Sequence, residues 1–265
     1  MNKKDNILII GAGLCGSLLA LRLAQRGYKV EVYESRPDLR TTDISAGRSI
    51  NLALSDRGLK ALRLCGMEEK AREICIPMYG RLMHDTKGNT FSSNYSGREN
   101  EFINSISRGD LNAINKKCKN VDIENTIAHF KDYKTKKEFS INADVIFGTD
   151  GAGSSLRKSY VSERKFLFSY SQNYLNHGYK ELEIPADKRG KHQISNAHLH
   201  IWPRGDFMLI ALPNMDGSFT VTLFLSYNEG EFNFENLTSE EKITKFFEKE
   251  FPDALALIPN ILEEF

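Results

Sequence analysis

One glycine-rich segment near the N-terminus constrains the fold of this 265-residue chain more than any other feature. The apolar residues 7–10 lead into Gly-Ala-Gly-Leu-Cys-Gly at 11–16, and leucines at helical spacing follow as far as residue 26. A second strand-like run, residues 29–33, ends at the acidic Glu34. This order predicts a β-α-β unit whose glycine turn and helix N-terminus face the pyrophosphate of a dinucleotide.

Each glycine of this segment has a physical reason. Gly11 permits the tight turn, Gly13 lets the backbone approach a pyrophosphate, and Gly16 lets the helix pack closely on the strand. Glu34 lies where such a unit binds a ribose hydroxyl. The segment therefore predicts a bound adenine dinucleotide, and the alternative is a glycine turn without a ligand.

The composition is that of an ordinary globular protein and excludes several classes of function. Hydrophobic residues make up 40% and charged residues 27%, enough for one large domain or two modest ones. The net charge of +1 gives no electrostatic support for binding nucleic acid or an anionic membrane. We expect no membrane-spanning segment and no signal peptide. The four cysteines form no CxxC pair and no metal-binding spacing, which favours reduced thiols and a cytoplasmic location.

Beyond the first unit, turn residues separate short extended runs, which is typical of a mixed α/β architecture. Helices are expected to begin at Ser55 and at Glu68, and a third is expected to be capped by Thr238 and Ser239. The predicted strands are residues 48–54, several runs within 79–106, 121–130, 139–141, 143–148, 179–184, 197–202, 207–212 and 219–224. The runs 121–130 and 139–141 predict a hairpin, and the last two runs predict an antiparallel pair.

Eight blocks of sequence along the chain match a known group of enzymes. They are GAGLCG at 11–16, GRSINLALS at 47–55, IPM at 76–78, SRGDLN at 107–112, GTDG at 148–151, HGY at 177–179, HIWPR at 200–204 and IALPN at 210–214. With these blocks the chain resembles the class A flavoprotein aromatic hydroxylases, and within them the kynurenine 3-monooxygenase family. The resemblance implies FAD as cofactor, NADPH and O2 as co-substrates, and hydroxylation of L-kynurenine to 3-hydroxykynurenine through a flavin hydroperoxide.

The same resemblance implies how the chain is divided. The expected fold is α/β, with a Rossmann-like FAD-binding domain formed by residues 1–78 and 98–170. An inserted β-sheet substrate domain is expected from residues 79–97 and 171–265. Because the cofactor carries the chemistry, no catalytic side chain is expected.

The resemblance also implies a set of cofactor contacts. Glu34 is expected to hold the adenosine ribose, Arg108 the FAD phosphates, and Asp150 the region of the flavin and ribityl chain. The whole implied set is Gly11, Gly13, Leu14, Cys15, Gly16, Glu34, Ser35, Arg36, Ala53, Arg108, Cys118 and Asp150. The alternatives are solvated or ion-paired side chains for the two arginines, strand packing for Ala53 and a helix cap for Asp150.

For the substrate, the resemblance implies a cationic end and an apolar floor. Arg81 matches the family's partner of the kynurenine carboxylate, and Tyr95 matches the phenol that adds a hydrogen bond. The expected ring contacts are Leu199, Met208, Ile210, Leu212 and Phe224. The three that alternate at 208–212 share a strand face, for which the alternative is an ordinary core.

Two histidines and one short segment leave alternatives open. His198 and His200 alternate on one strand, but no third ligand has suitable spacing, so no metal is predicted. The helix that starts at residue 110 becomes polar after barely one turn. We therefore expect residues to be skipped between Ile114 and Asn115, with a Cα separation above about 3.8 Å.

Family members carry a second flavin motif and further helices beyond the point that residue 265 matches. A second interpretation is therefore a non-catalytic or partner-dependent FAD-binding fragment, with residue 265 as the end of a partial chain. A third is an NAD-dependent dehydrogenase, which the block at 48–55 and the Asp150–Gly151 pair argue against.

Overall fold

The N-terminal β-α-β unit forms as the glycine pattern predicts. The computed structural model describes residues 5–35, 51–96, 98, 101–107, 117–132 and 135–265. Strand β1 (Asn6–Ile10), helix α1 (Leu14–Gln25) and strand β2 (Lys29–Tyr33) follow one another, and β1 lies between β2 and β11 (Val145–Gly148) in a parallel sheet. This is the arrangement of a Rossmann-like nucleotide-binding fold.

The chain forms two compact units, which are described separately. Unit 1 comprises Met1–Gly47, Ala61–Met67 and Gly109–Gln172, and unit 2 comprises Arg48–Lys60, Glu68–Arg108 and Asn173–Phe265. Helix α2 (Asp56–Leu64) contributes residues to both units. Unit 2 thus holds segments that the predicted functional division assigns to cofactor binding, and that division stays a prediction.

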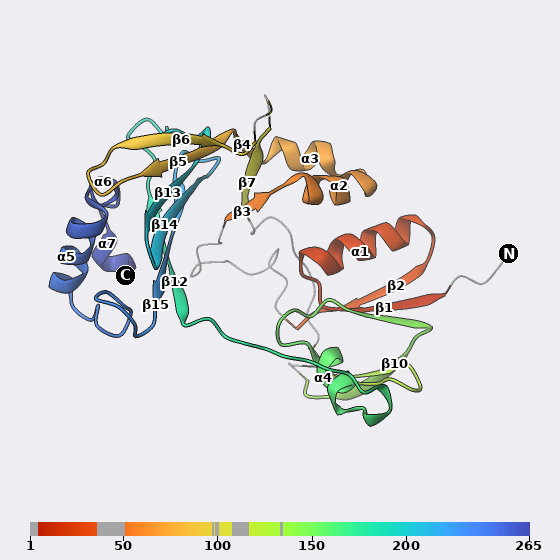
Figure 1. The fold of residues 1–265 in the computed structure, drawn as a ribbon. Coiled ribbons are helices and arrows are strands. Elements are labelled where there is room, and N and C mark those ends of the chain that lie inside the picture. Colours follow the sequence, from red (N-terminus) through yellow and green to blue (C-terminus); the bar gives the residue numbers. More distant parts are fainter. Residues whose placement is uncertain (1–4, 36–50, 97, 99–100, 108–116, 133–134) are drawn as a thin grey trace. The chain divides into compact units, whose positions relative to one another are not determined.

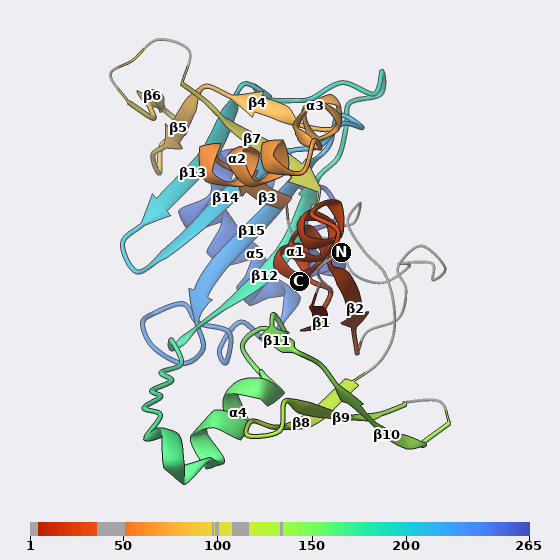
Figure 2. The ribbon, with the colours of Figure 1, turned by 90° about the vertical axis from the view of Figure 1, so that its right-hand side faces the viewer.

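A second sheet of unit 1 packs against the first. Strands β8 (Lys117–Asp122), β9 (Ile127–Lys131) and β10 (Glu138–Asn142) form an antiparallel meander, and helix α4 (Ser155–Ser162) lies against β8 (Figure 2). A 3-10 turn, Arg164–Phe166, follows α4. The core of this unit consists of Leu8, Ile10, Val121, Ala128, Phe130 and Ala143.

The prediction that residues 121–130 form one strand, the first arm of a hairpin, is wrong. The chain turns at residues 123–126 instead of continuing as one strand. The carboxylate of Asp122 accepts a hydrogen bond from the backbone N–H of Asn125, and Thr126 adopts a positive φ of 55°. Aspartate and asparagine side chains favour such turns by bonding to the backbone a few residues along, a signal present in the sequence.

Unit 2 is built on a six-stranded sheet. Its order is β12-β15-β14-β13-β5-β6, and all neighbours are antiparallel except β13 and β5, which are parallel. The strands are β5 (Gly80–His84), β6 (Thr90–Asn94), β12 (His177–Ile184), β13 (His198–Arg204), β14 (Phe207–Pro213) and β15 (Phe219–Ser226). The predicted antiparallel pairing of 207–212 with 219–224 is confirmed.

Three helices cover one face of this sheet (Figure 1). They are α5 (Glu240–Glu250), α6 (Pro252–Leu255) and α7 (Ile261–Glu264). The predicted cap of α5 is confirmed, because the Ser239 hydroxyl accepts a hydrogen bond from the backbone N–H of Lys242. Alternate residues of the strands, including Trp202, Leu209 and Leu223, are fully buried beneath the helices and form the core.

A small antiparallel sheet completes unit 2. It contains β3 (Asn51–Leu54), β7 (Ile103–Ser107) and β4 (Ile76–Met78), in the order β3-β7-β4, and helix α3 (Glu68–Glu73) leads into β4. The Asn51 amide donates to Asn214 Oδ1 at 2.6 Å, and the Ser105 hydroxyl donates to the Pro213 carbonyl at 2.9 Å. These bonds fix the small sheet to the end of β14.

Some predictions fall outside this description. Arg36, Arg108 and the proposed discontinuity between Ile114 and Asn115 lie outside the described residues. Within the described parts of the chain, no helix combines the length and the apolar character needed to cross a membrane.

Candidate functional site

The glycine turn of unit 1 leaves the start of α1 without a side-chain cap. Gly11 has φ of +99°, and a Cβ built on it would lie 2.5 Å from the Thr149 carbonyl oxygen. A Cβ on Gly16 would lie 2.0 Å from the carbonyl oxygen of Gly11. Helix α1 begins after Gly13 with no side-chain cap and no acidic residue in its first turn. Its positive end is therefore available to an anionic group.

Glu34 braces this turn from the end of β2. It is 7% exposed, and its Oε2 accepts the Ala12 N–H at 2.8 Å while its Oε1 accepts the Ser35 N–H at 2.7 Å. The predicted contacts Leu14 and Cys15 are the first, exposed residues of α1. The structure thus brings Glu34 and Ser35 to the glycine turn.

The end of β11 supplies the second half of the turn. The Thr149 hydroxyl donates to the Gly11 carbonyl at 2.6 Å. Asp150 Oδ2 accepts the Ser155 N–H at 2.7 Å, so this carboxylate helps to cap α4 together with Ser154. Asp150 Oδ1 is buried and has no hydrogen-bond partner among the described residues. A buried carboxylate oxygen without a donor is costly unless a ligand supplies one.

The sequence did not single out Thr149, although it locks the glycine turn to β11. Its signal is a hydroxyl residue between a buried strand and the Asp150–Gly151 pair. Two further predicted contacts belong to other elements: Ala53 is an exposed residue of β3 in unit 2, and the backbone of Cys118 pairs with Phe130 within the β8–β9 meander.

The predicted substrate residues lie together on the open face of the six-stranded sheet. Leu209 and Ala211 belong to the helix-covered core, so Met208, Ile210 and Leu212 between and beside them point to the other face. By the same alternation Leu199 precedes the buried His200, and Phe224 lies between two buried leucines. Met208 pairs with Phe224 and Leu199 pairs with Arg81 across neighbouring strands.

These apolar residues differ in burial from the core beneath the helices. Among them only Leu212 is buried, at 5% exposure, whereas Met208 is 40% exposed. The residues that pack under the helices are their immediate neighbours in sequence. The alternation therefore separates a face that is packed under the helices from a face that is more exposed at most of these positions.

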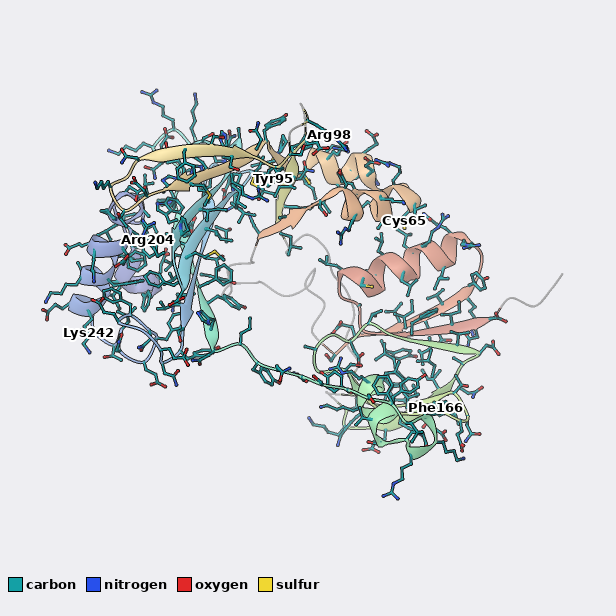
Figure 3. All side chains as sticks on the ribbon, viewed as in Figure 1. Cys65, Tyr95, Arg98, Phe166, Arg204 and Lys242 are labelled. Carbon is teal, nitrogen blue, oxygen red and sulfur yellow. The ribbon has the colours of Figure 1, made fainter. Side chains whose placement is uncertain are left out.

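Arg81 and Tyr95 form the polar end of the same face. The Arg81 guanidinium lies 4.6 Å from the centroid of the Tyr95 ring, and Tyr95 follows β6 (Figure 3). The Tyr95 hydroxyl is buried without a partner among the described residues. Burial raises the pKa of this phenol to about 12, although the Arg81 charge acts in the opposite direction. A fixed cation thus lies beside an unused O–H donor, an arrangement suited to a carboxylate.

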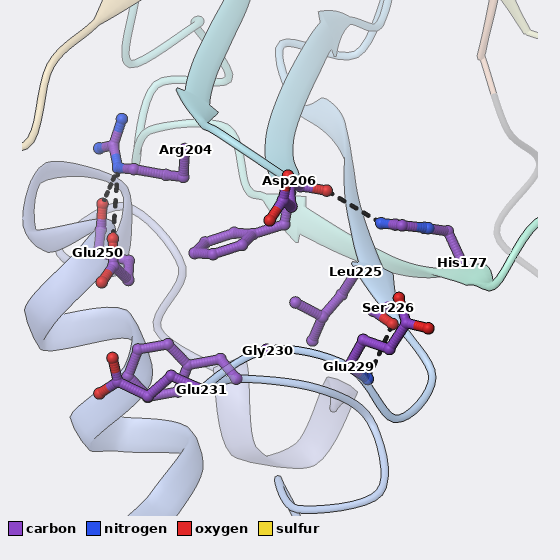
Figure 4. A pocket seen from close by; sticks show the side chains of 11 residues that line it. His177, Arg204, Asp206, Leu225, Ser226, Glu229, Gly230, Glu231 and Glu250 are labelled. Atoms are coloured by element: carbon purple, nitrogen blue, oxygen red, sulfur yellow. Dashed lines mark hydrogen bonds and ion pairs between the residues drawn. The ribbon is translucent and has the colours of Figure 1, made fainter.

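A separate hollow lies where β14 begins and β15 ends. This cavity of about 540 Å³ is lined by residues that include His177, Arg204 and Glu250 (Figure 4). None of the predicted site residues lines it, and Arg204 is already engaged by the Glu250 carbonyl at 2.6 Å. We therefore place the candidate substrate site on the open sheet face, where the buried Tyr95 hydroxyl has no partner among the described residues.

The two histidines that alternate on β13 contact other protein groups. Within the described parts of the chain, no three His, Cys, Asp or Glu side chains are placed to hold a metal ion together. His198 Nδ1 lies 2.9 Å from the Ser195 hydroxyl, and His200 contacts His84 at 2.9 Å. The sequence alone does not predict the contact between His84 and His200, because the two residues meet only through the parallel pairing of β5 with β13.

Known proteins with a similar fold include several solved structures. A family profile described as NAD(P)-binding Rossmann-like domain matches residues 9–74. Among solved structures, the tetrameric form of 2-methyl-3-hydroxypyridine-5-carboxylic acid oxygenase superposes with a TM-score of 0.72 at 16% identity, covering 99% of this chain and 68% of that one. Klebsiella pneumoniae HpxO complexed with FAD and uric acid gives 0.67 at 15% identity, covering 96% and 65%. The predicted Rossmann-like α/β fold with a β-sheet second part is confirmed.

Three enzymes are similar to this chain in sequence along nearly its whole length. The chain is 43% identical to kynurenine 3-monooxygenase of Myxococcus xanthus over 99% of its length, and 44% identical to that of Flavobacterium johnsoniae over 100%. The enzyme of Dictyostelium discoideum is 41% identical over 98% of the chain. The predicted resemblance to kynurenine 3-monooxygenases is confirmed. The chain spans 59%, 61% and 58% of the lengths of these relatives.

Proposed function

We propose that this chain is the cofactor- and substrate-binding part of an FAD- and NADPH-dependent monooxygenase that converts L-kynurenine to 3-hydroxykynurenine. The observation that carries the proposal is the open sheet face of unit 2. It combines a cation, an unpartnered phenol hydroxyl and an apolar floor in a chain that is 41–44% identical to kynurenine 3-monooxygenases. Kynurenine offers the matching groups, a carboxylate and an aromatic ring.

The residues of unit 1 fit a flavin dinucleotide. The uncapped start of α1 suits the pyrophosphate, Glu34 suits the ribose, and Asp150 Oδ1, which has no partner among the described residues, suits a hydroxyl donor. We include Arg36 and Arg108 among the FAD contacts on the resemblance alone. When bound, FAD supplies the redox and oxygen chemistry, with NADPH as reductant and O2 as oxidant. We assign residues 1–78 and 98–170 to this role.

The residues of unit 2 orient the substrate in this proposal. Arg81 binds the carboxylate with its planar guanidinium, and Tyr95 donates a hydrogen bond to it. Because the pKa of Tyr95 is raised to about 12, its hydroxyl keeps the proton that it donates at neutral pH. Leu199, Met208, Ile210, Leu212 and Phe224 contact the ring and exclude water. No side chain of this face needs to act as nucleophile or general base.

A second candidate is a partner-dependent FAD-binding fragment of such an enzyme. It is favoured by one observation, the 58–61% of the relatives' length that the chain spans. We also propose a cytoplasmic location. This proposal rests on the sequence, in which the four cysteines form no CxxC pair, and is tested by fractionation.

Kynurenine-stimulated NADPH oxidation separates these candidates. The purified chain is loaded with FAD, and NADPH consumption and 3-hydroxykynurenine are followed with and without L-kynurenine. Stimulated oxidation with product supports the monooxygenase, whereas stoichiometric flavin without stimulation supports the partner-dependent fragment. Absence of bound flavin together with NAD-linked hydride transfer contradicts both.

Arg81→Ala tests the assignment of the substrate face. Loss of a charge-assisted pair costs about 1.5–3 kcal/mol, so kynurenine affinity should fall roughly 10- to 100-fold. Calorimetric titration with kynurenine measures this change, and flavin absorbance serves as the control because FAD content should not change. Unaltered kynurenine affinity in this variant contradicts the assignment.

A further inference from the structure

A buried chain of hydrogen bonds runs from α6 through two strands on the helix-covered face of unit 2. The Asp253 Oδ2 atom lies 2.8 Å from His84 Nδ1, and His84 Nε2 lies 2.9 Å from His200 Nδ1. His200 Nε2 in turn lies 2.7 Å from the carbonyl oxygen of Ser195. His84 is 6% exposed and His200 1% exposed, so the two rings are shielded from water, whereas the Asp253 side chain at one end is 25% exposed.

This chain of hydrogen bonds needs more protons than two neutral imidazoles supply. Its two ends, a carboxylate and a backbone carbonyl, are hydrogen-bond acceptors. Three hydrogen bonds require three N–H or O–H protons, but two neutral imidazoles carry only two. We infer that the folded protein binds one additional proton within the Asp253–His84–His200 chain, which leaves these three side chains together without net charge. The count holds wherever along the chain the third proton lies.

The surroundings disfavour the additional proton on His200 and on Asp253. Burial lowers the pKa of His200 to about 4, which disfavours a cation there. Burial acts to raise the pKa of Asp253, but hydrogen bonds from His84 and Trp202 bring it below its usual value. The Trp202 indole N–H donates to the same Asp253 oxygen at 2.9 Å, and its ring stacks on His84 with centroids 4.0 Å apart. Asp253 is therefore the anion that compensates the additional proton.

Other charged groups nearby balance one another. Arg204 on β13 donates to the His84 carbonyl oxygen at 3.0 Å, and its Nε lies 3.9 Å from the Glu250 carboxylate of α5. Asp85, next to His84 in the β5–β6 turn, also acts on Arg204, and His198 on β13 acts on His200. Because Arg204 is paired with Glu250, the extra proton depends mainly on Asp253.

The extra proton predicts how stability depends on pH. In the unfolded chain Asp253 is ionised at these pH values, and both imidazoles lose their protons near pH 6.5. Above that pH the folded cluster binds one proton more than the unfolded chain, so stability decreases as the pH rises. Below it, the unfolded chain binds one proton more, so this contribution decreases as the pH falls toward about 4, where His200 is protonated in the folded state. Each limb changes the folding equilibrium constant by about tenfold per pH unit.

Urea unfolding of the full chain at pH 6.5, 7.5 and 8.5 tests the alkaline limb. Asp253→Asn removes the compensating charge, so the variant should not retain the third proton and should lose the alkaline dependence. The ratio of wild-type to variant folding constants should fall about tenfold per pH unit. Glu248→Gln, which removes an exposed carboxylate of α5, is the matched control and should keep the wild-type slope. Parallel pH profiles for wild type and Asp253→Asn would overturn the inference.

A direct measurement keeps the inference testable if Asp253→Asn does not fold. The wild-type chain contains six histidines, whose ring nitrogens can be resolved by NMR after 15N labelling. At pH 8 we expect one ring protonated on both nitrogens and hydrogen-bonded to a second ring that is protonated on Nε2 only. Finding no doubly protonated ring at pH 8 would refute the third proton.

Discussion

Gly16→Ala provides a test in which two physical effects predict opposite changes in the stability of the protein. Alanine is favoured over glycine in a helix interior by about 1 kcal/mol, so helix propensity alone predicts a more stable protein. In this structure the new Cβ would lie 2.0 Å from the Gly11 carbonyl oxygen and 2.5 Å from Thr149 Oγ1. The helix and the turn must separate by roughly 1.4 Å to restore ordinary contact.

The magnitude follows from what this separation disturbs. Overpacking against fixed backbone costs about 3 kcal/mol, and displacement of the Gly11 carbonyl breaks its bond from the Thr149 hydroxyl, which contributes about 1 kcal/mol. After the gain in helix propensity, the net loss is about 3 kcal/mol. For a chain of this size, that loss lowers Tm by about 6–12 °C.

Thermal unfolding of the full chain measures the shift, and titration with FAD followed by flavin fluorescence reports the turn itself. Gly153→Ala is the matched control, since a Cβ there meets nothing within 4 Å and its φ lies outside the left-handed region. We expect the control to change Tm by no more than about 2 °C. A Gly16→Ala protein with an unchanged or raised Tm would refute the close packing of α1 on the glycine turn.

Two further substitutions test other parts of the chain. Tyr95→Phe removes a buried hydroxyl without a partner among the described residues, so stability in urea should be unchanged or higher, whereas kynurenine affinity measured by titration should fall about tenfold; a loss of stability with unaltered affinity would contradict this. Ser239→Ala removes the N-cap of α5 and should lower the free energy of unfolding by about 1 kcal/mol, measured in urea, and an unchanged midpoint would show that the cap is dispensable.

The parts of the fold that the sequence predicts are those specified by local signals. The glycine turn, the strands with alternating apolar residues and the Ser239 cap each depend on neighbours within a few residues. The turn at 123–126 was missed because flanking residues favour an extended chain and outweigh the short Asp-x-x-Asn signal. The resemblance supplied the candidate site residues, and five of them share one sheet face because alternation along β13, β14 and β15 is itself local.

What the sequence does not predict depends on pairing between distant strands. Nothing near His84 or His200 indicates that the two rings touch, since their contact requires the parallel register of β5 and β13. An unpaired buried oxygen, such as Tyr95 Oη or Asp150 Oδ1, is equally invisible before the surrounding atoms are placed. Long-range register is the information that a pattern of single residues lacks.

The two faces of the β5–β13 pair connect the buried proton to the proposed substrate site. Arg81 lies opposite Leu199 in this register, and Leu82 lies opposite His200. The hydrogen bond between His84 and His200 therefore spans the same two strands that bring the cationic end next to the apolar floor. These strands are parallel, a pairing that is slightly less stable per residue than an antiparallel one. A charge-assisted bond on the covered face thus strengthens the strand pairing that joins Arg81 to the apolar floor.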